Sequence, residues 1–246
     1  RENLLDEQKN LKFLLKNKSH QMDTLSYEIK KIKFDLSDKI QRLTSIESPP
    51  EVKPVNFEVF IEREPITIVL SDQNWIRSHK GHLDTNYEFK YREGDKRKIE
   101  VHAYTTDKIL CFSNFGYFFT VKGNDLPSGR GLGEHLSKMV ELKNDEKIIN
   151  IFPFFDGKVV LASSDGFGFK VSTKQLLAST KSGKRILSLN KNVEAKSVVP
   201  CHGNLLVVVG YNRKMLIFPI SELPEQNKGK GVILQRYKDG LLSDIK

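Results

Sequence analysis

The sequence predicts a mainly β protein: a propeller-like β-pinwheel of about four to five four-stranded blades, preceded by an α-helical segment. Three observations support this. All sixteen glycines and nine prolines lie beyond residue 48, so the first 46 residues lack the residues that interrupt helices. Beyond residue 57, short apolar runs alternate with tight turns, as β-strands do. The same strand–turn–strand layout recurs four times, at intervals of 42, 50 and 47 residues, and repeats of that period are typical of propeller blades.

Residues 1–46 are predicted to form two helices, at about 2–17 and 19–45. Their polar junction, residues 16–20, predicts a break with Ser19 as the N-cap of the second helix. Two interleaved tracks of apolar residues with heptad-like spacing predict a coiled-coil-like face: Leu4, Leu11, Leu25 and Ile32, and Leu15, Met22, Ile29, Leu36 and Leu43. The segment is either a tail that dimerises or the base of a stalk that follows another domain.

Residues 47–57 are predicted to be a Pro-rich, semi-stiff linker, because Pro49 and Pro50 bar the helix from continuing. The remaining residues, 58–246, form the predicted β domain. The chain does not begin with Met, and a helical pattern is already under way at its first residue, so we expect it to be part of a longer protein.

Four β-hairpins are predicted within residues 66–77, 109–119, 159–171 and 205–218. Their turns include Asp165-Gly166, which suits the positive φ angles that hairpin turns require. A further apolar segment follows each hairpin, at 99–104 and 148–152 and, in looser form, at 186–189 and 232–235. Residues 242–246 resemble the entry to a fifth unit.

The charge balance favours a polyanionic partner, because 40 Lys and Arg face 31 Asp and Glu, for a net charge of +9. No run of 18 apolar residues predicts a transmembrane segment. Cys111 and Cys201 lack Cys-x-x-Cys spacing, so we predict small core residues and a reducing cytoplasm. Apart from His79-x-x-His82, which we interpret as surface residues, the histidines have no metal-like spacing. We therefore predict no metal site and no catalytic residue.

Basic residues recur in or just after the second strand of each hairpin and in the loop that follows. Lys and Arg on one surface are what phosphate contacts need, and flanking glycines let backbone N–H groups approach a phosphate as well. Because these positions recur from unit to unit, we expect them to line one edge of the disc. The candidate DNA-binding residues are Arg77, Lys80, Lys122, Arg130, Lys174, Lys181, Lys184, Arg185, Arg213, Lys214, Lys228 and Lys230.

Three motifs carry a family resemblance. The motifs are Trp75-Ile76-Arg77-Ser78-His79-Lys80-Gly81-His82, Phe89-Lys90-Tyr91-Arg92-Glu93-Gly94-Asp95 and Leu126-Pro127-Ser128-Gly129-Arg130-Gly131-Leu132-Gly133-Glu134. In this order they resemble the first two blades of bacterial type IIA topoisomerase A subunits of the topoisomerase IV kind. Residues 41–46 match in part the Arg-Arg-Thr-x-Ile pattern that ends the family's breakage-reunion domain. The resemblance covers essentially the whole chain. It implies a β-pinwheel whose blades exchange strands and whose edge binds and bends duplex DNA.

The resemblance also implies a larger enzyme around this chain. Its parent would pass one duplex through a break in another, decatenating and relaxing DNA during chromosome segregation. The nucleophilic tyrosine would precede Arg1, and no Tyr of this chain matches its context, so the fragment itself is expected to lack activity. Mg²⁺ and ATP would be cofactors held by the other type of subunit in the enzyme, and none is expected in this fragment. Expected partners are duplex DNA, the B subunit of topoisomerase IV and, through the preceding region, a second copy of the A subunit. The expected location is the cytoplasm, in association with the nucleoid. The family resemblance also allows peripheral association with the membrane.

Two alternatives stay open at this point. Gyrase A subunits carry a Gln-Arg-Arg-Gly-Gly-Lys/Arg-Gly box in the first blade, whereas this chain has the unlike segment Lys80-Gly81-His82-Leu83-Asp84. That difference favours topoisomerase IV over gyrase. The other alternative is a propeller-like protein-interaction adaptor on a coiled-coil stalk, whose basic charge is incidental. Basic residues concentrated along one edge would favour the DNA-binding module.

Overall fold

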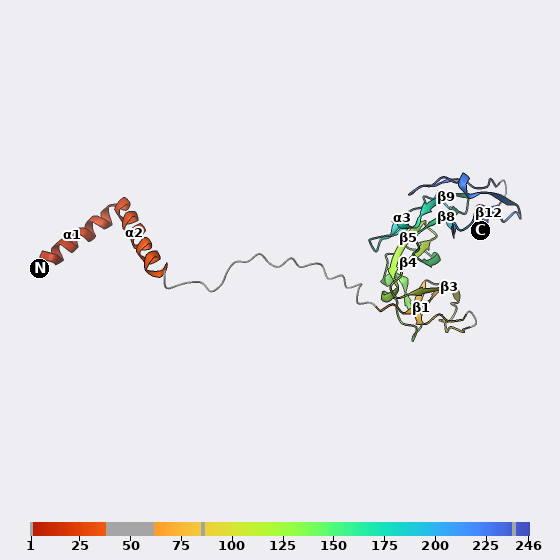
Figure 1. Cartoon of the computed structure of the whole chain (residues 1–246), viewed down its shortest axis with the longest axis horizontal. Coiled ribbons are helices and arrows are strands. Elements are labelled where there is room, and N and C mark those ends of the chain that lie inside the picture. Colours follow the sequence, from red (N-terminus) through yellow and green to blue (C-terminus); the bar gives the residue numbers. More distant parts are fainter. Residues whose placement is uncertain (1, 38–61, 85–86, 238–239) are drawn as a thin grey trace. The chain divides into compact units, whose positions relative to one another are not determined.

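The computed structural model describes residues 2–37, 62–84, 87–237 and 240–246. The chain divides into two compact units, Arg1–Val55 and Asn56–Lys246 (Figure 1). The predicted linker, 47–57, lies outside the described residues, and so does the predicted end of the second helix.

Residues 2–37 of the first unit form two helices, α1 (Glu2–Lys16) and α2 (Lys18–Ser37). The predicted break is present, but Ser19 as the N-cap is wrong, because α2 already begins at Lys18. Asn17 separates the helices: its N–H donates to the Phe13 carbonyl at 3.1 Å, and its own carbonyl accepts from Gln21 N–H at 3.1 Å. The apolar residues of both helices are largely exposed in this chain, with Leu15 78% exposed. The dimerising tail and the base of a stalk therefore both remain interpretations of this segment.

The described part of the second unit consists of four antiparallel sheets, which confirms the mainly β prediction. In the described part of the unit, the one α-helix is the single turn α3 (Thr173–Leu176). The strands are β1 (Pro65–Ser71), β2 (Trp75–Lys80), β3 (Arg97–Tyr104), β4 (Lys108–Ser113), β5 (Tyr117–Lys122), β6 (Glu134–His135), β7 (Ile148–Pro153), β8 (Lys158–Ser163), β9 (Phe167–Ser172), β10 (Lys184–Arg185), β11 (Ala195–Pro200), β12 (Leu205–Gly210), β13 (Met215–Pro219), β14 (Val232–Ile233) and β15 (Leu242–Ile245); the 3₁₀ turns are η2 (Gly123–Asp125), η3 (Leu136–Lys138) and η4 (Ile220–Glu222).

All four predicted hairpins are present, as β1–β2, β4–β5, β8–β9 and β12–β13. The residue that closes each turn has a positive φ: 61° at Asn74, 79° at Gly116, 82° at Gly166 and 60° at Arg213. Glycine adopts this conformation without a steric penalty, and Asn tolerates it better than most residues. The turn chemistry thus places each hairpin where the sequence predicts it.

Neighbouring sheets of the β unit exchange strands, as the resemblance implies. The short strand β6 follows β5 in sequence but pairs with β2 of the preceding sheet. In the same way β10 pairs with β5, and β14 pairs with β9. The sheet orders are therefore β3-β1-β2-β6, β10-β5-β4-β7 and β11-β8-β9-β14, and the described part of the fourth sheet is β13-β12-β15.

The pairing of strands corrects three predictions. Residues 242–246 are not the entry to a fifth unit, because β15 pairs with β12 inside the fourth sheet and buries Leu242 and Ile245. Residues 232–235 do not supply the inner strand of the fourth unit, because β14 belongs to the third sheet. Residues 186–189 do not supply the further strand of the third unit either, because Ile186 and Leu187 donate their N–H groups to the Gly116 carbonyl of the second sheet. In the third sheet that strand is β11, at Ala195–Pro200, which pairs with β8. Apolar pattern identifies a strand but not the sheet that it joins.

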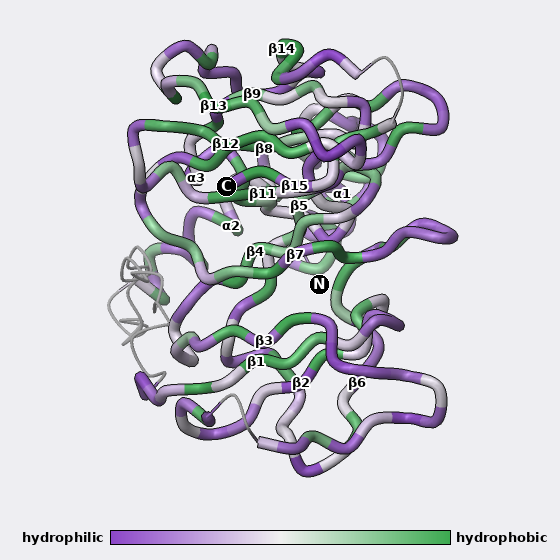
Figure 2. The backbone as a smooth tube through the Cα atoms, turned by 90° about the vertical axis from the view of Figure 1, so that its right-hand side faces the viewer, coloured by the Kyte–Doolittle hydropathy of each residue, from purple (hydrophilic) through white to green (hydrophobic). Residues whose placement is uncertain are grey.

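The hydrophobic cores lie between neighbouring sheets. One core is shared by the first and second sheets, a second by the second and third, and a third by the third and fourth. Phe112 and Phe118 stack in the second core with ring centroids 4.5 Å apart. Figure 2 shows the sheet strands as mainly hydrophobic and many of the connecting loops as hydrophilic. Each sheet thus buries its faces against its neighbours, which one isolated blade could not do.

Candidate nucleic-acid interface

Each exchanged strand is the end of a longer segment, here called a strap, that crosses from one sheet to the preceding one. The first strap is residues 123–136, the second 173–186 and the third 220–234. Each begins with one helical turn and has a buried apolar residue near its start and another at its end. These buried pairs are Leu126 and Leu136, Leu176 and Ile186, and Leu223 and Leu234. The residues between them are left largely at the surface, and the straps form the outer side of the sheets.

A glycine with positive φ positions the end of each strap. Gly133 has a φ of +82°, Gly183 of +70° and Gly231 of +83°, and a Cβ on Gly133 would lie 2.6 Å from the Ile76 carbonyl oxygen. Three residues after each glycine, the buried residue that ends the strap donates its N–H to a carbonyl in the hairpin turn of the preceding sheet. The donor and acceptor pairs are Leu136 and Asn74 at 2.9 Å, Ile186 and Gly116 at 3.0 Å, and Leu234 and Gly166 at 2.8 Å. The sequence signal for this contact is a recurring Gly-x-x-Leu/Ile, which the spacing of the hairpins does not reveal.

Several predicted site residues lie together on the second strap. Lys174, Lys181, Lys184 and Arg185 are all exposed, and the last two form β10, the outermost strand of the second sheet. Lys184 Nζ donates to the Gln175 carbonyl at 2.7 Å, which holds its ammonium over the strap. Lys174 Nζ lies 2.8 Å from Asp156 Oδ2. The second strap therefore carries the densest group of predicted phosphate contacts.

The remaining predicted residues are more scattered. Arg130 is exposed on the first strap, and Lys228 is exposed on the third. Lys230 is half-buried, with its Nζ 3.5 Å from the centroid of the Phe167 ring. Lys80, Arg213 and Lys214 are exposed but lie off the straps: Lys80 ends β2, 3.0 Å from Glu64, and the other two are in the β12–β13 turn.

Arg77 does not belong to the surface set. It is only 5% exposed, and its guanidinium donates to the carbonyls of Gly131, at 2.7 Å, and Lys90, at 2.6 Å. The side chain of this β2 residue points under the first strap and away from the surface on which phosphate contacts are predicted. Neighbouring His79 is likewise no simple surface residue. Burial and, secondarily, the charge of Arg77 lower the pKa of His79, so its ring adds no positive charge at neutral pH.

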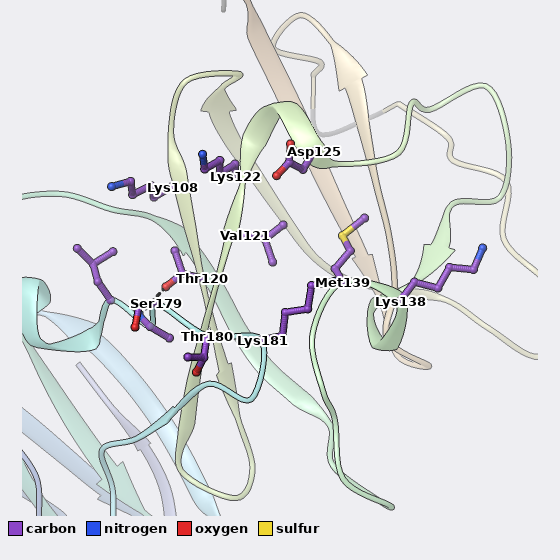
Figure 3. A pocket seen from close by; sticks show the side chains of 12 residues that line it. Lys108, Thr120, Val121, Lys122, Asp125, Lys138, Met139, Ser179, Thr180 and Lys181 are labelled. Carbon is purple, nitrogen blue, oxygen red and sulfur yellow. Dashed lines mark hydrogen bonds between the residues drawn. The ribbon is translucent and has the colours of Figure 1, made fainter. Parts of the chain in front are cut away.

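A hollow of about 740 Å³ lies between the β4–β5 hairpin, residues 138–139 and the second strap (Figure 3). Lys108, Lys122, Lys138 and Lys181 line it, and Asp125 is the acidic residue in its lining. Lys108 and Lys122 face each other across the β4–β5 register and lie side by side in Figure 3. An anion bound in the hollow would be attracted by the positive charge of these lysines. Sequence reasoning missed Lys108 and Lys138 because Lys108 begins a strand and Lys138 follows the exchanged one.

Two other kinds of site find no support in the structure. Among the residues it describes, no three His, Cys, Asp or Glu side chains are grouped so as to hold a metal ion. No helix within the same ranges is long and apolar enough to cross a membrane. The chemistry of the outer side is that of fixed cations on a rigid β scaffold, which suits a polyanion.

Comparisons with known proteins identify the family. The model of the DNA gyrase C-terminal domain, a β-propeller, matches residues 107–154, 157–202 and 205–242. The A subunit of DNA topoisomerase 4 from Caulobacter vibrioides is 47% identical over 199 residues, which are 80% of this chain and 26% of the relative. The protein of the same name from Rickettsia bellii is 39% identical over 250 residues, covering 99% of this chain and 34% of the relative.

A solved structure agrees with these sequence relatives. The E. coli ParC C-terminal domain superposes with a TM-score of 0.68 at 29% identity, covering 74% of this chain and 78% of that one. The chain spans about a quarter to a third of the length of the curated relatives. It belongs to the β-propeller family of DNA gyrase C-terminal domains, and the relatives that it resembles are topoisomerase IV A subunits.

Proposed function

We propose that the β unit is a duplex-DNA-binding domain that uses the basic outer side of its straps without reading base sequence. The observation that carries this proposal is the hollow beside the second strap, where four lysines and one aspartate line the same surface. Lys181 belongs to both the hollow and the strap, so the hollow adjoins the exposed Lys184 and Arg185. One phosphate backbone running along this side meets both groups.

The proposed contacts are electrostatic. A lysine that neutralises a phosphate releases a condensed counterion, so affinity falls with salt in proportion to the number of contacts. Base reading needs side chains that match donor and acceptor patterns in a groove, such as a bidentate Asn or Gln on adenine. The strap contacts proposed here are mostly lysines, which act as point charges toward phosphate. Binding to any duplex sequence is the consequence.

In the parent protein, we propose, this domain steers DNA for the strand passage of a topoisomerase IV. The names of the relatives support topoisomerase IV over gyrase. The catalytic tyrosine, the ATP and the Mg²⁺ of that reaction would lie outside this chain, on the preceding part of the A subunit, or on the B subunit. Two A subunits would dimerise through that preceding region. The enzyme would work in the cytoplasm, in association with the nucleoid and peripherally with the membrane.

A salt series of duplex binding tests the proposal. We would compare the parent chain with Lys184→Gln/Arg185→Gln and with a matched control, Lys147→Gln/Lys191→Gln. The control removes the same charge from exposed residues in the loops that lead into β7 and β11. Binding of a labelled duplex is measured by fluorescence anisotropy.

The strap variant is expected to lower the slope of log affinity against log salt by about two units, at roughly 0.9 per phosphate contact, with the same result for two unrelated duplex sequences. The control should keep the parent slope. Equal slopes for all three proteins would argue for the adaptor, whose basic charge is incidental. Tighter binding to one sequence would show that base edges are read.

A further inference from the structure

Arg77 occupies a position that is aromatic in the next two sheets. It follows Ile76, which pairs with Leu70 next to the hairpin turn. The equivalent pairs next to the turns of the following two hairpins contain Phe118 and Gly168. The equivalents of Arg77 are therefore Phe119 and Phe169, which are 1% and 0% exposed. Each of these rings packs against the positive-φ glycine of its strap. The fold is thus built at this position with a phenyl ring, and it does not require a charge there.

The guanidinium of Arg77 joins two loops that come from different units. It bonds the Gly131 carbonyl of the first strap and the Lys90 carbonyl of the loop that follows β2. It also lies 5.6 Å from the centroid of the Phe89 ring and 5.3 Å from that of Tyr91. Burying a guanidinium costs stability unless its donors are satisfied, and here both bonds go to loop carbonyls.

The strap held in this way presents Arg130 outward. Ser78 N–H donates to the Pro127 carbonyl at 2.8 Å, and His79 packs so closely on Gly129 that a Cβ there would overlap its ring. Gly133 lies on the Ile76 carbonyl. Between these contacts Ser128, Arg130 and Leu132 are exposed. The strap alternates between residues against β2 and residues toward solvent, and Arg77 holds it next to Arg130.

We infer that Arg77 is a positioning residue, which acts on DNA without touching it by fixing the first strap so that Arg130 meets a phosphate. The inference rests on the proposed function and deepens it. The guanidinium ties the strap, through Gly131, to the loop that contains Lys90. A strap held in this way loses less freedom when Arg130 binds, so the contact is stronger than from a loose loop. The second and third straps, seated on Phe119 and Phe169, have no such link to a second loop at this position.

The test compares the full chain with Arg77→Phe, Arg130→Ala and the double variant. Phenylalanine is the residue that the next two sheets use, so Arg77→Phe is expected to keep the fold and its melting temperature. We would measure duplex affinity across salt and, without DNA, the rate of tryptic cleavage after Arg130 relative to cleavage after Lys181. Arg77→Lys serves as a second variant, because it keeps the charge but lacks the planar fork that reaches two carbonyls.

Arg77→Phe is expected to lower the salt slope by about one unit, as Arg130→Ala does, although Arg77 is buried. The double variant should bind as Arg130→Ala does, and cleavage after Arg130 should be faster in Arg77→Phe. Arg77→Lys should show a smaller loss in the same direction. An unchanged slope in both Arg77 variants, or additive losses in the double variant, overturns the inference.

The two proposals fail in different ways. If Arg130→Ala keeps the parent slope while Lys184→Gln/Arg185→Gln loses it, the positioning role of Arg77 falls and DNA binding by the straps stands. If neither variant loses slope, both proposals fall.

Discussion

Replacing Gly133 by alanine should detach the first strap from the first sheet. Gly133 has a φ of +82°, and an added Cβ would lie 2.6 Å from the Ile76 carbonyl oxygen and 3.3 Å from the Arg77 Cβ. The left-handed conformation costs an L-residue about 1–2 kcal/mol. Ile76 is fully buried in β2 and cannot move aside, so overpacking adds about 1–3 kcal/mol. The lower entropy of the unfolded alanine chain offsets about 0.4–1 kcal/mol.

The net loss expected for Gly133→Ala is about 1–4.5 kcal/mol, or a fall in Tm of roughly 3–14 °C at about 3 °C per kcal/mol for a domain of this size. The matched control is Gly131→Ala, two residues away in the same strap, where no atom lies within 4 Å of an added Cβ. The control should change the free energy of unfolding by less than about 0.5 kcal/mol.

Urea unfolding followed by tryptophan fluorescence measures both variants. Trp75 is the only tryptophan, and its ring meets that of His135, in β6, edge-on with centroids 5.7 Å apart. Its emission therefore reports the docking of the strap end. Equal midpoints for Gly133→Ala and Gly131→Ala would refute the reasoning that the positive-φ glycine seats the exchanged strand.

Three further predictions follow from single groups. Ile186→Ala should lower the free energy of unfolding by about 2–5 kcal/mol, since Ile186 is fully buried at the end of the second strap; a loss under about 1 kcal/mol in urea unfolding would mean that the site collapses around the cavity. Burial raises the pKa of the Cys111 thiol to about 12, so a thiol reagent should modify half-buried Cys201 first, and Cys111 only after urea is added; equal rates in the folded chain would contradict this. Because the pKa of His79 is lowered on folding from its ordinary 6.5, the unfolded chain binds that proton more readily, and stability should fall as the pH drops through 6.5. In His79→Gln the urea midpoint should change less between about pH 7.5 and about pH 5.5, and an identical pH profile would show that His79 does not contribute.

Local sequence patterns were enough to predict the fold class and the four hairpins. Apolar alternation and turn residues act over a few neighbouring positions, so Asp165-Gly166 specifies its own turn wherever the hairpin lies. The break between the two helices was predictable for the same reason, although Asn17 rather than Ser19 marks it. The recurring basic residues that follow the second strand of each hairpin were also visible, because repetition needs no structure to be seen.

Which strand joins which sheet became clear from the folded chain alone. Strand β15 pairs within the fourth sheet, and β14 completes the third. An apolar pattern predicts that a segment is a strand, but it does not specify the distant strand with which the segment pairs. Burial also separated Arg77, bonded beneath the first strap, from Arg130, exposed upon it. Both are arginines in basic, strand-adjacent sequence, and the difference between a positioning residue and a surface cation arises only when the strap of one unit crosses the strand of another.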